Sequence, residues 1–282
     1  MRVLVTNDDG IDSPGLTVLA NVAHAAGHDV LVAAPSHQYS GASASLIGHE
    51  VDGRLELTDG APPGLVEGVP AHGVRAAPAL ITFAAGYGAF GERPDLVLSG
   101  VNLGANTGHA TLHSGTVGAA LSAATQSIPA LAVSIASADP AHWATAEEVC
   151  RVAFDWMVEH APEGRVLNVN VPDVPMERLR GLRVARLAQF GAVQAAVKER
   201  GEGWVHMSYE EIDVEHEPGT DAYLLEHGWA TASLLRTPIH DVAEPAPPEF
   251  TTDAAEHAED VVEVSRGRTM SSGREPGDRG RD

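Results

Sequence analysis

The sequence is poor in cysteine, in long apolar runs and in basic residues, and each shortage excludes a class of protein. Cys150 is the only cysteine, which excludes an intrachain disulfide framework and a thiolate metal cluster and indicates a reducing environment. No stretch approaches the roughly 20 apolar residues of a membrane span. The residues after Val3–Thr6 are acidic and turn-forming, unlike a signal peptide. We therefore expect a soluble, cytoplasmic protein.

The charge balance excludes polyanionic partners. The chain has 18 Lys and Arg against 39 Asp and Glu, a net charge of −21. Neutralising nucleic-acid phosphates or docking on an anionic membrane requires a basic surface, so we expect neither partner. A small phosphorylated substrate stays compatible with this acidity if a cation sits in the site.

The apolar pattern predicts an α/β fold. The 282 residues are enough for one large or two small domains at about 150 residues each. Apolar runs without strict alternation, typical of strands covered on both faces, alternate with helix-like segments. The runs span residues 3–6, 28–34, 95–99, 130–135 and 166–171. This order predicts a doubly wound, mostly parallel sheet.

Two helices carry start signals. Ser13 and Pro14 suit the cap and first position of a helix that ends near Gly27. Thr145–Glu148 has the spacing of a capping box, with apolar residues at helical spacing after it. We expect a second helix to begin there.

The C-terminal third differs in composition. Residues 182–187, 203–209 and 230–235 read as strands, which predicts a β-rich extension. We expect one α/β domain over 1–242, with a core at about 1–177 and the extension at about 178–242. The segment 243–282, first rich in Pro and acidic residues and then in Gly and Arg, is predicted to be disordered.

Three oxygen-rich segments follow predicted strands. Asp8 and Asp9 come directly after the first strand, and Ser40 lies after the second. Asn102 belongs to the segment 99–102, which ends the strand that starts at residue 95. The carboxyl ends of parallel strands meet at one edge of a sheet, so these oxygens converge on a site suited to Mg²⁺ or Mn²⁺. By itself Asn7–Gly10 also fits a solvated turn, because Asn, Asp and Gly are turn formers.

A candidate phosphate cradle follows. It comprises Asn106 in a Gly-rich stretch and Ser114, Gly115 and Thr116 at the start of an Ala-rich helix. Small residues and a helix N-terminus allow backbone N–H groups to bind an anion. A plain helix cap is the alternative interpretation of Ser114.

These motifs together resemble the survival protein E (SurE-type) 5'/3'-nucleotidases, in family order over about residues 1–240. The matching segments are 7–10, 14–15, 40–43, 99–102, 104–108, 114–117, 167–172 and 219–221. The resemblance implies a Rossmann-like core and a C-terminal extension used in homodimer or homotetramer assembly. It implies hydrolysis of nucleoside monophosphates with one divalent cation per subunit.

The resemblance also implies residue roles. Positions matching Asp8, Asp9, Ser40 and Asn102 hold the cation, and those matching Asn106, Ser114, Gly115 and Thr116 surround the phosphate. Asp8 and Asp9 are the candidate catalytic groups, orienting a water or acting as a base; a covalent aspartyl phosphate is a less favoured route, because a metal-bound carboxylate is poorly placed for in-line attack.

The chain departs from the family pattern in two places. Residues 69–74, which include His72, stand where family members usually have Thr-Pro, a small residue and Asp-Cys-Val. His109, Ala110 and His113 stand where acidic residues and a Tyr are usual. Both departures leave the nucleoside preference open, and His109 or His113 is a candidate general acid.

Other functions are compared on the same residues. Adjacent aspartates disfavour a haloacid-dehalogenase-like phosphatase, which needs Asp-x-Asp after its first strand. The missing G-x-G-x-x-G disfavours a dinucleotide-binding oxidoreductase. A non-catalytic nucleotide- or metal-binding module, or a phosphatase for another small phosphomonoester, remains an alternative.

Overall fold

The computed structural model describes residues 1–189, 193–211 and 216–237. One compact unit spans Met1–Pro238. The segment 243–282, for which disorder is predicted, lies outside the described residues. Within the described ranges, no helix combines the length and the apolar character that a membrane crossing requires.

A nine-stranded sheet is the centre of the fold, in the order β10-β13-β9-β8-β7-β1-β2-β6-β5. Its strands are β1 (Arg2–Thr6), β2 (Asp29–Pro35), β5 (Leu57–Thr58), β6 (Ala71–Val74), β7 (Leu96–Leu103), β8 (Ala130–Ile135), β9 (Arg165–Val171), β10 (Leu182–Val184) and β13 (Ala230–Arg236). All neighbours from β9 to β6 are parallel, as are β10 and β13. The β13–β9 and β5–β6 pairs are antiparallel. The predicted mostly parallel sheet is confirmed.

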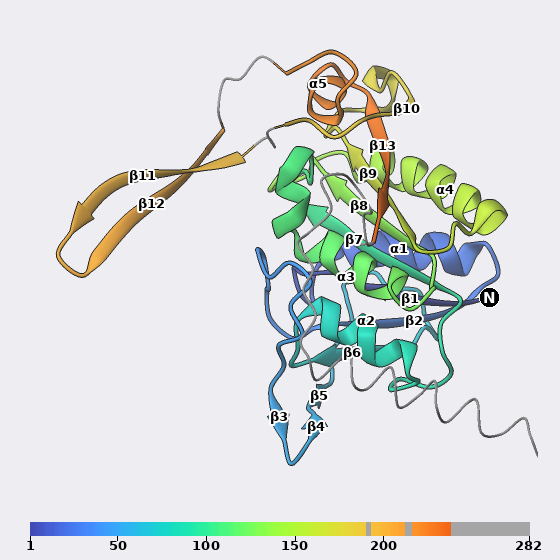
Figure 1. Cartoon of the computed structure of the whole chain (residues 1–282). Helices are drawn as coiled ribbons and strands as arrows, with labels where there is room; N and C mark the ends of the chain where they lie inside the picture. The colour runs from blue at the N-terminus through green and yellow to red at the C-terminus, as the bar shows by residue number, and fades with distance from the viewer. Residues whose placement is uncertain (190–192, 212–215, 238–282) are drawn as a thin grey trace, which may run out of the picture. The chain divides into compact units, whose positions relative to one another are not determined.

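Helices cover both faces of this sheet (Figure 1). Helices α1 (Pro14–Ala25) and α4 (Trp143–His160) pack together on one face, and α2 (Pro78–Gly86) and α3 (Gly115–Ala124) pack together on the other. Side chains alternate across a strand, so Val3 and Val5 enter the core under α1 and α4, whereas Leu4 enters the other core. Because the central strands β1, β7, β8 and β9 are buried from two sides, they need apolar residues at most positions.

The strands predicted in the first part of the chain are present, within a residue of their expected bounds at most ends. The prediction was wrong for 95–99, because β7 continues to Leu103 through an irregular register between Ser99 and Asn102. Gly100 lies there with φ of +130°, and a Cβ on it would lie 2.2 Å from the Val133 carbonyl oxygen. Only glycine fits this irregular step, which brings Asn102 to the end of the strand.

In the C-terminal third, the strand predicted at 230–235 is β13, and the one predicted at 203–209 corresponds to β12 (Trp204–Glu211), which begins one residue later and ends two residues later. The prediction of 182–187 was too long, since β10 ends at Val184. Strand β11 (Val193–Gly201) was not anticipated and pairs with β12 in a separate antiparallel hairpin. Its sequence carries Gln, Lys, Glu and Arg rather than an apolar run.

The helix predictions had different outcomes. Helix α1 begins at Pro14 with Ser13 as its cap, as predicted. The capping box at Thr145 was wrong, because α4 already begins at Trp143 and the Thr145 hydroxyl donates to the Val174 carbonyl. The Asp173 carboxylate accepts the His142 backbone N–H instead (2.9 Å). A residue outside the helix therefore replaces the local cap.

The remaining elements are short and include a second small hairpin, β3 with β4. They are β3 (Glu50–Val51), β4 (Arg54–Leu55), the 3₁₀ helices η1 (Gly108–His113) and η2 (Met176–Arg178), and α5 (Asp221–Glu226).

Candidate active site

A closed turn presents two carboxylates at the end of β1. The Asn7 side chain is fully buried, donates from Nδ2 to the Gly10 carbonyl and accepts the Gly10 N–H at Oδ1, both at 3.1 Å. Asp8 and Asp9, which we call the carboxylate pair, lie inside this turn. The turn chemistry of Asn7 therefore fixes the backbone that carries the pair.

Asp8 is buried against the N-terminus of α3, with 3% of its surface exposed. The Thr116 hydroxyl donates to Asp8 Oδ1, and the backbone N–H groups of Gly115 and Thr116 donate to the same carboxylate. A Cβ on Gly115 would lie 2.7 Å from Asp8 Oδ2, so only glycine allows this approach. Burial raises the pKa of the Asp8 carboxyl, and these hydrogen bonds oppose the rise.

Asp9 lies against the end of β7. Its Oδ2 accepts the Leu103 backbone N–H at 3.2 Å. Burial and the neighbouring Asp8 charge raise the pKa of Asp9 to about 7, because each disfavours a second negative charge. The site therefore holds two carboxylates whose charges are poorly compensated by the protein.

Asn102 lies next to Leu103 and adds an amide oxygen to this edge. Its Nδ2 donates to the Gly104 carbonyl at 2.7 Å. Among the described residues nothing donates to its Oδ1 at hydrogen-bond distance. An amide whose nitrogen is fixed and whose oxygen is unused is suited to hold a hard cation.

Ser40 lies in a loop that is held at the same edge by the backbone of its neighbour Tyr39. The Tyr39 N–H donates to the Asp8 carbonyl at 2.7 Å, which fixes the loop after β2 beside the carboxylate pair. Ser40 itself is exposed, and its hydroxyl accepts from Gln38 Nε2 at 3.0 Å. The structure thus brings Asp8, Asp9 and Asn102 to one edge, with Ser40 in the adjoining exposed loop.

Among the described residues, no basic side chain pairs with the carboxylate pair. In the described part of the chain, neither Asp8 nor Asp9 forms an ion pair with Lys, Arg or His. The same residues contain no group of three or more His, Cys, Asp or Glu that could hold a metal. A cation here would depend on two carboxylates completed by neutral oxygens, which is a donor set for Mg²⁺ or Mn²⁺ rather than for zinc.

The residues of the candidate phosphate cradle have defined structural partners. Ser114 is the N-cap of α3, and its Oγ accepts the Val117 N–H at 3.1 Å. Gly115 and Thr116 face Asp8, as described above. Asn106 lies between β7 and η1, in a segment that runs to the first residue of η1 and that we call the 104–108 loop. Its Nδ2 donates to Ser134 Oγ at 2.8 Å.

Three buried polar residues that the sequence analysis assigned no role contact this loop. Asn168 and Asn170 on β9 bind the Asn106 backbone, and Asp221 at the start of α5 binds Gly108. A signal was present, since two Asn at alternate positions within an otherwise apolar strand place two amides on one face. Nothing local in the sequence indicates that Asp221 is fully buried.

The histidines at the departures from the family pattern are exposed or half-buried. His109 and His113 are exposed on η1, and His72 is half-buried on β6. The Ser43 hydroxyl donates to the Leu112 carbonyl at 2.7 Å, which joins η1 to the loop after β2. His109 and His113 therefore border the edge that carries the carboxylate pair.

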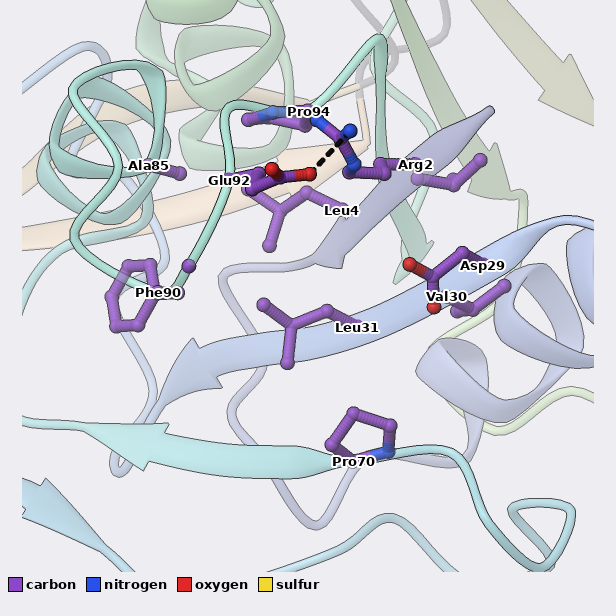
Figure 2. A pocket seen from close by; sticks show the side chains of 12 residues that line it. Arg2, Leu4, Asp29, Val30, Leu31, Pro70, Ala85, Phe90, Glu92 and Pro94 are labelled. Carbon is purple, nitrogen blue, oxygen red and sulfur yellow. Dashed lines mark ion pairs between the residues drawn. The ribbon is translucent and has the colours of Figure 1, made fainter.

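A cavity of about 270 Å³ lies at the opposite edge of the sheet, at the amino ends of β1 and β2. Figure 2 shows Leu31, Phe90 and Pro70 around it, with Arg2 and Glu92 paired beside it. It contains no residue of the candidate site, so its lining does not bear on that chemistry.

The fold and the site define a Rossmann-like α/β protein with paired carboxylates at the carboxyl edge of its parallel strands. Residues 3–193 match the family model described as "Survival protein SurE". The chain belongs to this family, which confirms the resemblance found in the sequence.

Relatives and solved structures agree with this assignment. The chain is 36% identical over 245 residues to the 5'-nucleotidase SurE of Gloeobacter violaceus, covering 84% of this chain and 90% of the relative. It is 38% identical over 247 residues to that of Nitrosococcus oceani, covering 85% and 91%. The crystal structure of the SurE protein from Aquifex aeolicus superposes with a TM-score of 0.69 at 25% identity, covering 93% of this chain and all of that one.

Proposed function

We propose that this protein hydrolyses nucleoside monophosphates, as a 5'-nucleotidase that also accepts 3'-nucleotides, to a nucleoside and inorganic phosphate. The observation that carries the proposal is the carboxylate pair: two adjacent, largely buried carboxylates without a basic partner in the described residues, beside the unused amide oxygen of Asn102. The relatives named 5'-nucleotidase SurE support the substrate class.

The donor set fits a divalent cation. Asp8, Asp9, Asn102 and Ser40 would hold it, and waters would complete the coordination, as Mg²⁺ requires. When bound, the cation neutralises phosphoryl charge and lowers the pKa of a water nucleophile. The elevated pKa values of Asp8 and Asp9 support this assignment, since a positive charge at this point would relieve both.

The protein's own groups would orient the phosphoryl group. The Ser134 hydroxyl can donate or accept, so the Asn106 amide can turn its NH₂ toward the substrate while its oxygen accepts from Ser134. The positive end of α3, with Ser114 as its cap, favours an anion beside Asp8. Asp9 uses only Oδ2 for Leu103, so Oδ1 can accept a proton from the attacking water.

Metal removal and two substitutions test the proposal. Chelator-treated protein should release phosphate from AMP or GMP only after Mn²⁺ or Mg²⁺ is restored. Asp8→Asn and Asp9→Asn should each lower kcat/KM by at least about 100-fold. Asp12→Asn is the matched control, because Asp12 follows the same turn but is exposed; it should retain full activity.

The rival functions give different outcomes in the same assay. Activity that survives chelation, or that persists in both Asp variants, would contradict a metal-dependent hydrolase. Nucleotide binding without turnover would indicate a binding module, and turnover of other small phosphomonoesters in preference to nucleotides would indicate another phosphatase. A panel of 5'- and 3'-nucleotides with Mg²⁺ and Mn²⁺ tested separately distinguishes these outcomes.

We further propose that the protein acts in the cytoplasm as a homodimer or homotetramer, as the resemblance implies. Light scattering coupled to size exclusion tests the assembly, and a monomer at micromolar concentration would contradict it.

A further inference from the structure

The 104–108 loop is held from beneath by residues outside the proposed catalytic set. Asn170 Oδ1 accepts the Asn106 N–H at 2.7 Å, and its Nδ2 donates to the Asn106 carbonyl at 3.0 Å. One amide therefore satisfies both backbone groups of Asn106, as a neighbouring strand would. Asn168 Nδ2 donates to the same carbonyl at 3.0 Å. Both asparagines are fully buried on β9, so the contacts come from the rigid sheet.

Asp221 holds the other end of this loop. Its Oδ2 accepts the Gly108 N–H at 2.9 Å, and its Oδ1 accepts those of Ala188 (2.8 Å) and Ala222 (2.9 Å). The side chain is fully buried. An ionised carboxylate accepts at both oxygens without donating, whereas an isosteric amide would direct an NH₂ at one of these N–H groups. The chemistry of the position therefore requires Asp.

Glycine lies at both ends of the loop. Gly104 and Gly108 have φ of +115° and +56°, in the region that favours glycine. Glycine loses more conformational freedom on folding than other residues, so the flanking glycines make external contacts necessary. Asn170 fixes the middle of the loop and Asp221 fixes its end.

We propose that Asn170 and Asp221 are positioning residues that hold the 104–108 loop so that Asn106 can receive the phosphoryl group. This inference rests on the proposed function, because it assumes that Asn106 contacts phosphate. Neither residue needs to contact the substrate. Asp221 follows the β11–β12 hairpin in sequence and also holds Ala188 before it, so the C-terminal segment is required to complete the site. A misplacement of about 1 Å costs roughly 100-fold in rate when orientation limits catalysis.

The test compares Asp221→Asn with Asp173→Asn. Asp173 is also a largely buried carboxylate that accepts backbone N–H groups at the start of a helix, but it binds Ala141 and His142 rather than the loop. In the Mn²⁺-loaded protein, Asp221→Asn should weaken inorganic phosphate binding, measured by calorimetry, at least about tenfold and lower kcat/KM by about 100-fold. Mn²⁺ affinity should stay within about twofold, since the carboxylate pair is not in contact with Asp221. Asp173→Asn should lower Tm without weakening phosphate binding.

Asn170→Ser and Asn168→Ser give a second comparison on one strand. Asn170→Ser removes both of the hydrogen bonds that Asn170 makes to the Asn106 backbone. Asn168→Ser leaves the Asn106 carbonyl bound to Asn170. Asn170→Ser should therefore weaken phosphate binding more than Asn168→Ser does. Amide exchange of a peptide covering 104–113 should accelerate in Asp221→Asn and Asn170→Ser but not in Asp173→Asn. Amide exchange can be measured without turnover. Inactive wild-type protein would therefore contradict the proposed function, while the exchange comparison would still show whether Asn170 and Asp221 hold the loop in place. Unchanged exchange and phosphate binding in both variants, or no phosphate binding by the wild type, would overturn the positioning role.

Discussion

The Thr116 hydroxyl donates a hydrogen bond to Asp8 Oδ1 across 108 positions of sequence. Thr116 is fully buried at the start of α3, so this bond is shielded from solvent. A hydrogen bond to an ionised carboxylate is stronger than one between neutral groups and favours the charged form. The Thr116 bond therefore opposes the rise that burial causes in the pKa of Asp8.

Removing this hydroxyl should impair cation binding. Thr116→Val keeps the approximate shape but no longer donates, so the pKa of Asp8 should rise further. We expect Mn²⁺ affinity and kcat/KM to fall about 10- to 100-fold. Thr116→Ser keeps the donor and should remain within about threefold of wild type. A larger loss in Thr116→Ser than in Thr116→Val would show that the methyl group, rather than the hydroxyl, matters.

Gly115→Ala should displace the carboxylate pair from α3. The added Cβ would lie 2.7 Å from both Cβ and Oδ2 of Asp8, whose side chain is buried. We expect at least about a tenfold loss of kcat/KM and a lower Tm. Gly86→Ala, at the end of α2, is the control: the three atoms nearest to its Cβ would all belong to the end of the Gln126 side chain, which can move. Full activity in Gly115→Ala would contradict the close packing of α3 on Asp8.

The stability of the metal-free protein should depend on pH through Asp9. The pKa of Asp9 is about 7 in the folded protein against 3.8 for an unperturbed aspartate carboxyl. Between these values the folded state binds a proton that the unfolded state does not, so stability falls as pH rises toward 7. Chelator-treated protein should therefore melt several degrees higher at pH 5 than at pH 8, given about 2–4 °C per kcal/mol for a chain of this size.

Asp9→Asn supplies the control for this pH dependence, because it cannot ionise. The difference in Tm between pH 5 and pH 8 should shrink in this variant. Added Mn²⁺ should raise Tm at pH 8 in the wild type and much less in Asp9→Asn. Identical pH profiles for the two proteins would exclude Asp9 as the titrating group.

Cys150 should be unreactive in the folded protein. Its side chain is fully buried on α4, and burial raises the pKa of the thiol well above its ordinary value. A thiol reagent should modify less than about a tenth of the protein under native conditions at pH 8, and one thiol per chain after denaturation. Rapid modification without loss of structure would show that α4 opens readily.

Sequence reasoning succeeded where a local signal and a general rule of the fold agreed. The apolar runs that became β1, β8 and β9 are long enough to be recognised, and a parallel sheet brings Asp8, Asp9 and Asn102 to one edge. It failed at β11, where the polar residues of a hairpin strand give no apolar signal. It also failed at α4, where Asp173, 31 positions from His142, supplies the contact that the capping box was expected to make.

The sequence by itself determined the α/β class, the family and the carboxylate pair, because each depends on short motifs or on the spacing of apolar residues. Only the tertiary structure decided that Thr116 binds Asp8, and that Asn170 and Asp221 hold the 104–108 loop. Those contacts join residues 64 to 113 positions apart. Their partners are fixed by strand register and helix packing, which no local pattern of residues specifies.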